Sequence, residues 1–153
     1  MSPTEILTTT PAVFDNAHVT PRRRTLRRVG AGLAGFVAIA VLSHATDGVL
    51  RAAGVFPAFG VPMSNALFGV ALAYRTIYDV LGCYIAARFA PDRPMRNALA
   101  LGIVGLVLSA LGVVAALAKG PELGPIWYPI ALLATTLPAA WLGGHLRTRQ
   151  ARA

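Results

Sequence analysis

Four long apolar stretches restrict what this chain can fold into: residues 29–50, 64–90, 97–118 and 126–146. A helix of about 20 residues crosses the ~30 Å hydrocarbon core of a bilayer, and each stretch is long enough to do so. The chain is 56% hydrophobic and 13% charged, whereas soluble domains carry about a quarter charged residues. Because the connections are short, neighbouring helices must run antiparallel. We therefore predict an all-α integral membrane protein, an antiparallel four-helix bundle.

The polar ends of the chain lie outside these stretches. We predict that residues 1–28 form a disordered basic cytoplasmic tail, because residues 1–20 are rich in Thr and Pro without an apolar period. Residues 29–146 are the predicted transmembrane domain, and residues 147–153 a second basic cytoplasmic tail. The first apolar run also resembles an export signal, but it is longer than a signal core and three further runs follow it. We therefore expect an uncleaved anchor.

The basic residues predict how the chain is threaded. Eleven of the 14 lie before the first stretch, around the second connection or after the last stretch, whereas only Arg51 and Lys119 lie in the other two connections. Cytoplasmic loops are enriched in Arg and Lys, so we predict that both termini are cytoplasmic. Thirteen of the 14 are Arg, and Ala and Gly are abundant. This composition is typical of GC-rich bacterial genomes and predicts the bacterial plasma (inner) membrane.

The third stretch carries small residues spaced four, three, four, three and four apart: Ala98, Gly102, Gly105, Ser109, Gly112 and Ala116. Such a repeat stays on one face of a helix and lets two backbones approach closely in a membrane. We predict that it forms a helix-packing seam. The second stretch has a similar series, which we expect to face it: Gly69, Ala73, Thr76, Val80, Cys83, Ala87 and Ala90.

Ionisable and phenolic side chains within the first two stretches form a candidate intramembrane polar site. Charged groups at membrane depth are unfavourable and are therefore candidate functional residues. Arg75 and Asp79 are four residues apart and can neutralise each other on one helix face. Alternatively, Arg75 can reach towards Asp47 in the first stretch and bridge it to Asp79. Three interpretations stay open: a structural staple between the two helices, a substrate, ion or proton site, or a contact with a lipid headgroup or quinone. The candidate residues are His44, Asp47, Tyr74, Arg75, Tyr78 and Asp79.

No catalytic motif is present in the sequence. Cys83 is the single cysteine, and the three histidines are scattered, so neither a thiol pair nor a metal-ligand cluster can be built. We expect no enzymatic activity, no metal and no cofactor. The arginines have no aromatic residues interleaved among them, so we also expect no nucleic-acid partner.

Several short motifs resemble a group of small bacterial inner-membrane proteins with four transmembrane helices and no known activity. The resemblance covers roughly residues 43–147. It implies the same topology and marks Tyr74-Arg75 as a motif. The matching segments are Thr46-Asp47, Pro62-Met63-Ser64, Ala73-Tyr74-Arg75-Thr76, Ala86-Ala87-Arg88, Ala90-Pro91 and Trp127-Tyr128-Pro129.

Three functions are consistent with this sequence. The first, which we favour, is a structural or accessory subunit of a membrane complex, with the lipid bilayer and an unidentified membrane protein as partners. The second is a small homo-oligomeric transporter or channel that uses Asp47, Arg75 and Asp79. The third is a lipid- or quinone-binding membrane enzyme that uses Arg75.

Overall fold

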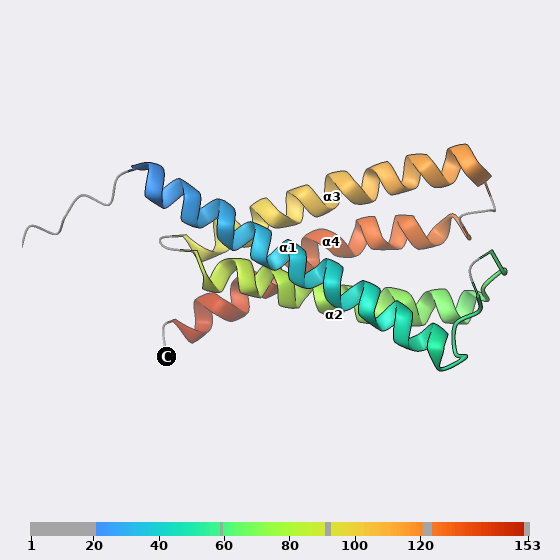
Figure 1. Cartoon of the computed structure of the whole chain (residues 1–153). Coiled ribbons are helices and arrows are strands. Elements are labelled where there is room, and N and C mark those ends of the chain that lie inside the picture. Colours follow the sequence, from blue (N-terminus) through green and yellow to red (C-terminus); the bar gives the residue numbers. More distant parts are fainter. Residues whose placement is uncertain (1–20, 59, 91–92, 121–123, 152–153) are drawn as a thin grey trace, which may run out of the picture.

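The computed structural model describes residues 21–58, 60–90, 93–120 and 124–151. Over these residues the secondary structure consists of four α-helices and no strands, which confirms the all-α prediction. Consecutive helices run in opposite directions (Figure 1). The helices are α1 (Pro21–Ala52), α2 (Asn65–Arg88), α3 (Pro94–Lys119) and α4 (Trp127–Gln150).

We refer to the two ends of the molecule as proximal and distal. The proximal end holds the start of α1, the end of α4 and the connection from α2 to α3. The distal end holds the connections from α1 to α2 and from α3 to α4. In Figure 1 the proximal end is on the left and the distal end on the right.

Three helices are long and apolar enough to cross a membrane: α1 from Arg22 to Ala52, α2 and α3. Large apolar side chains cover their outer faces; Val41, Ile77 and Leu117 are 59%, 64% and 68% exposed. A soluble monomer rarely leaves so much contiguous apolar surface in water, whereas lipid solvates it. The fourth helix, α4, has 24 residues but is less apolar, since Thr, Pro and His side chains interrupt it.

The helices extend beyond the predicted apolar stretches at the proximal end. Residues 21–28, which the domain prediction assigned to a disordered tail, are the first turns of α1, and residues 147–150 are the last turns of α4. The reason is that Arg is a good helix former and Pro is tolerated in a first helical turn. The apolar stretches therefore mark only part of the length of each of these two helices. The predictions for residues 1–20 and 152–153 lie outside the described residues.

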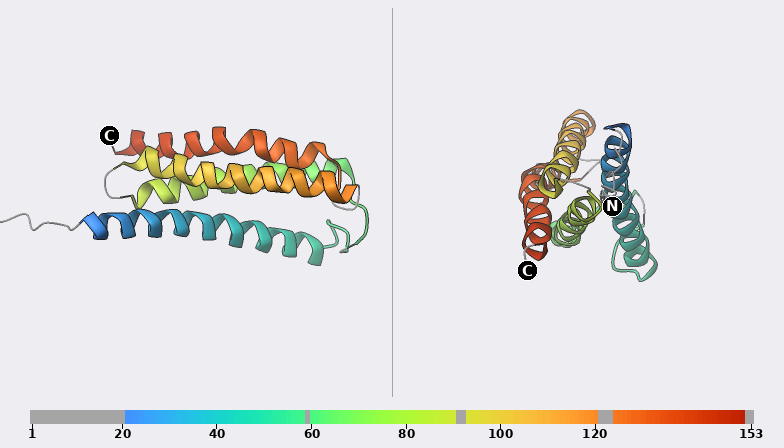
Figure 2. Two further views of the ribbon diagram at one scale, coloured as in Figure 1. Left: turned by 90° about the horizontal axis from the view of Figure 1, so that it is seen from above. Right: turned by 90° about the vertical axis from the view of Figure 1, so that its left-hand side faces the viewer.

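Helix α2 is the centre of the arrangement. It packs against α1, α3 and α4, and α3 packs along α4, whereas the backbones of α1 and α4 do not come close to each other. The end-on view of Figure 2 shows α1 and α4 on opposite sides of α2. The structure is therefore a three-helix group of α2, α3 and α4, with α1 packed mainly on α2 and less extensively on α3.

Small residues form the core where the helices cross. The buried cluster contains almost only small side chains: Cys83, Ala86, Ala87, Ala98, Leu101 and Ala140. Gly35 of α1 lies against the backbone of Gly82 in α2. A Cβ on Gly143 of α4 would lie 2.8 Å from the backbone nitrogen of Tyr84 in α2. Close backbone approach of this kind supplies van der Waals contact where lipid removes the hydrophobic driving force.

The small-residue seam of α3 packs mainly on α4, so the predicted pairing with α2 is wrong for its central residues. A Cβ on Gly102 would collide with Ala140 of α4, and one on Gly105 would lie 3.1 Å from Thr136 Cγ2. Ser109 Oγ is 3.5 Å from Thr136 Oγ1. Spacing along one helix predicts a packing face but cannot choose between two suitable partners, and α4 also presents small residues every fourth position.

The two ends of the seam behave differently from its middle. Ala98 belongs to the buried cluster that includes Ala86 and Ala87 of α2, so α3 also touches α2 near the proximal end. Gly112 has open space where a Cβ would stand, and Ala116 is buried. The predicted seam is thus an interface with α4 at its centre and with both helices near Ala98.

Pro138 lies inside α4, which continues on both sides of it. The helix changes direction near its middle in Figure 1. A proline removes one backbone hydrogen bond and pushes the preceding turn away. The bend therefore lies in the helix that packs against both α2 and α3.

Candidate functional site

Asp47 of α1 is the centre of a polar cluster near the distal end. Its Oδ2 accepts a hydrogen bond from Arg75 Nη2 at 2.7 Å, which is also an ion pair. Its Oδ1 accepts a hydrogen bond from the Tyr74 hydroxyl. The Arg75 and Asp47 side chains are 31% and 16% exposed. Both oxygens of the carboxylate are therefore bound by α2, in a partly desolvated setting that strengthens the attraction.

The backbone direction explains why Arg75 meets Asp47. Helical side chains lean towards the N-terminus of their helix, and the N-terminus of α2 is at the distal end, where Asp47 lies. Asp79 lies one turn further along α2, in the opposite direction. Among the described residues Asp79 has no hydrogen bond and no ion pair, so the predicted bridge from Arg75 has only its Asp47 half.

Other side chains extend the cluster across three helices. Thr46 Oγ1 of α1 and the Tyr78 hydroxyl of α2 are 2.9 Å apart. The Arg75 guanidinium carbon lies 6.0 Å from the centre of the Tyr128 ring in α4, at the outer limit of a cation–π contact. The cluster is therefore the place where α1, α2 and α4 come together through side chains, although α1 and α4 do not pack on each other.

One buried atom of the cluster lacks the partner that burial normally requires. Arg75 Nε is buried without a hydrogen bond in the described part of the chain, and unpaired polar atoms are unusual in packed proteins. The Asp79 side chain, one helical turn from Arg75, is half-buried.

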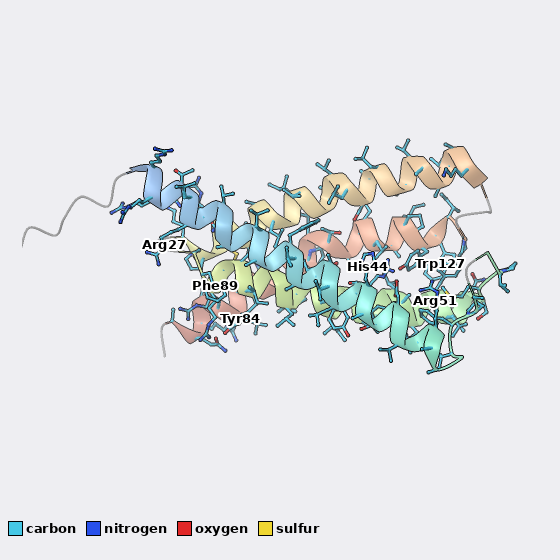
Figure 3. All side chains as sticks on the ribbon, in the orientation of Figure 1. Arg27, His44, Arg51, Tyr84, Phe89 and Trp127 are labelled. Atoms are coloured by element: carbon cyan, nitrogen blue, oxygen red, sulfur yellow. The ribbon has the colours of Figure 1, made fainter. Side chains whose placement is uncertain are left out.

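His44 stands apart from the other predicted site residues. Its Nδ1 lies 2.8 Å from the Ala40 carbonyl oxygen one turn earlier in α1, and the side chain is exposed. Figure 3 shows His44 between the proximal Arg27 and the distal Arg51. The structure thus brings Asp47, Tyr74 and Arg75 into direct contact and leaves His44 outside that contact.

The candidate site predicted from the sequence included neither Thr46 nor Tyr128. The position of Thr46 beside Asp47 within an apolar stretch was a usable signal for Thr46. Nothing in the linear sequence places the start of α4 beside Arg75. Tyr128 also contacts Phe68, with ring centres 5.0 Å apart, and so helps to hold α4 on α2.

No family model, curated protein or solved structure matches this chain. In the described parts of the chain, no three His, Cys, Asp or Glu side chains gather closely enough to hold a metal ion. The site must therefore be interpreted from its own contacts. These contacts can hold two helices together through a charged pair, and they leave one carboxylate and one imidazole open to further partners.

Proposed function

We propose that this protein is a four-span protein of the bacterial plasma membrane that serves as a structural or accessory subunit of a larger membrane complex. Both termini are cytoplasmic in this proposal, so the proximal end faces the cytoplasm. The support is the Arg distribution: among the described residues, the proximal end carries the arginines at 22–28, 88, 93, 96, 147 and 149.

The fourth span of this proposal is α4. It has the same length as α2, 24 residues, and packs along both α2 and α3. Gly143 and Gly144 are buried against those two helices. A helix that shares so much surface with two apolar helices belongs in the same layer of the membrane.

His44 is the observation that supports a partner protein. It lies eight residues before the end of α1, about 12 Å along the helix, and therefore within the membrane in this proposal. Ionisable side chains at that depth normally face other protein groups or a water-filled cavity. His44 instead is exposed on α1. A polar group on a neighbouring protein would cover the imidazole.

The interior contacts support the same proposal. Both oxygens of Asp47 are already bound by Tyr74 and Arg75, which suits a staple that keeps α1 on α2. With this contact in place, one face of α1 stays packed on α2 and its opposite face is available to a partner protein. The protein would then contribute a preassembled surface to a complex.

Site-specific photo-crosslinking in membranes of the cells that make the protein tests this proposal. The crosslinker replaces Val41, one turn from His44 and 59% exposed, and in a control it replaces Ile77 of α2, 64% exposed. We expect one discrete adduct with a second protein from Val41, its loss on His44→Leu, and no such adduct from Ile77. Equal adducts from both positions, or adducts to lipid alone, would contradict the proposal.

Asp79 favours a second candidate, a small homo-oligomeric transporter or channel. A half-buried carboxylate without a hydrogen bond among the described residues is available to bind a proton or cation. Purified protein in liposomes under an imposed pH gradient tests this candidate. It requires a proton flux that Asp79→Asn abolishes and Asp79→Glu retains, with both variants folded. A Val41 crosslink to a second copy of the chain would also support it.

A further inference from the structure

A groove of about 470 Å³ lies between the proximal halves of α1 and α3. Its walls are mainly apolar and include Leu33 and Phe36 of α1 and Leu101 and Val104 of α3. The lining extends from Asn97 to Val104 along α3, about 10 Å at 1.5 Å per residue. The groove is therefore elongated along the helix axes, in the direction that a lipid chain takes in a bilayer.

One end of this groove is polar and basic. Arg28 of α1 and Asn97 of α3 line it there, and Asn97 Nδ2 donates a hydrogen bond to the Arg28 carbonyl oxygen at 3.4 Å. Arg24 and Arg27 on α1 and Arg96 on α3 are exposed around the same end, and Figure 3 shows Arg27 at the proximal end. The first turns of α1 and α3 contain no acidic residue.

We propose that the groove binds one anionic phospholipid, with an acyl chain between α1 and α3 and the phosphate group among the arginines at the proximal end. Basic pockets between membrane helices suit anionic headgroups, and Arg matches phosphate oxygens with its planar set of donors. The start of α3 adds to the attraction, because no side chain caps its first turn and the N-terminus of a helix carries a partial positive charge.

The apolar part of the groove distinguishes a lipid from a free anion. Phosphate alone needs only the basic end, whereas an acyl chain also uses the wall from Gly32 to Phe36 on α1. The groove is charged at the proximal end and apolar towards the membrane centre. This arrangement matches the orientation of a lipid in the leaflet on the proximal side. The inference does not depend on the accessory role proposed above.

Gly32 makes a selective test possible. It lines the groove, and a Cβ there would have nothing within 4 Å. A larger side chain at this position can therefore extend into the groove, because its Cβ meets no neighbouring atom. Gly30 is a matched control: it is also free of neighbours within 4 Å, but the groove lining does not include it.

The experiment is native mass spectrometry of the full-length protein titrated with phosphatidylglycerol, and separately with phosphatidylcholine, in detergent micelles. We expect one tightly bound phosphatidylglycerol per chain. Gly32→Phe should weaken it at least tenfold, and Gly30→Phe should leave it unchanged. Arg28→Gln should reduce the preference for phosphatidylglycerol roughly fivefold, whereas Arg149→Gln on α4 should not.

Three results would overturn the proposal. Identical phosphatidylglycerol binding by Gly32→Phe and Gly30→Phe would show that the groove is not the site. Equal affinity for the two lipids would exclude recognition of the anionic headgroup. Displacement of the lipid by millimolar inorganic phosphate would mean that the basic end binds a free anion without using the apolar wall. The melting temperatures of the variants serve as the folding control.

Discussion

At the scale of single residues, the contact between Asp47 and Arg75 decides how α1 is held. The two groups belong to different helices and lie 28 positions apart in the chain. Each is unfavourable alone at membrane depth. Together, with Tyr74 on the second carboxylate oxygen, they leave Asp47 fully bound. The pair therefore fixes which turn of α1 lies beside which turn of α2.

Removing one partner of this pair should destabilise the protein. Asp47→Asn leaves the Arg75 guanidinium without its counter-ion. We expect a loss of about 2 kcal/mol in the free energy of unfolding, less than the roughly 3–5 kcal/mol typical of a fully buried pair, because both side chains are partly exposed. Unfolding in mixtures of SDS and mild detergent measures the loss.

Asp79→Asn is the matched control for this measurement. It removes a carboxylate on α2 that has no ion pair in the described part of the chain, so stability should stay the same or rise. The double variant Asp47→Asn, Arg75→Gln should recover part of the loss, because it leaves no unpaired charge. Equal losses for Asp47→Asn and Asp79→Asn would mean that the pair contributes nothing specific.

At the scale of helices, glycines determine how closely the elements pack. The seam of α3 was predicted from spacing alone, and its members have different surroundings in the folded chain. Gly102 stands against Ala140, Gly105 stands near Thr136, and Gly112 has open space. Positions that are equivalent in the sequence pattern therefore differ in how closely they approach the neighbouring helix.

This difference predicts a graded response to the same substitution. Gly102→Leu should disrupt the contact of α3 with α4 and cost about 3 kcal/mol or more, because the added atoms collide with a packed helix. Gly105→Leu should cost less, and Gly112→Leu should be tolerated. Melting temperature and the yield of monodisperse protein measure the series. A uniform response across the three positions would refute the assigned interface.

At the scale of the whole molecule, the attachment of α1 is the main feature. In a closed bundle every helix has two neighbours of similar importance. Here α1 packs mainly on α2 and much less on α3, and its backbone does not come close to α4. It therefore keeps an exposed surface around His44 and, nearer the proximal end, leaves a groove against α3.

The threading of the whole chain can be tested by thiol labelling from the two sides of the membrane. In a Cys83→Ala background, Ala58→Cys in the distal connection should react with an impermeant maleimide in intact cells. Arg149→Cys at the proximal end should react only after permeabilisation, because the Arg distribution predicts a cytoplasmic location. The reverse pattern of labelling would invert the proposed topology.

Much of the fold was predictable because its determinants are local. Apolar length identifies α1, α2 and α3 as possible membrane spans, and Ser64 marks the start of α2, where its hydroxyl accepts a hydrogen bond from the Leu67 N–H. The contact of Arg75 with Asp47 was also predictable as one of two pairings, because the apolar stretches contain so few charged groups that could pair. Composition alone did not predict the proximal turns of α1, because an arginine-rich segment has the same low hydropathy whether it is helical or disordered.

The remaining features depend on which faces meet in three dimensions. The series of small residues identifies the face of α3 that packs against another helix. It does not identify which helix that is. That this partner is α4 is seen where Gly102 lies against Ala140. The position of Tyr128 beside Arg75 and the groove at Gly32 likewise depend on how whole helices lie against one another. Hydropathy and spacing act along one helix at a time, whereas a crossing is a property of two helices together.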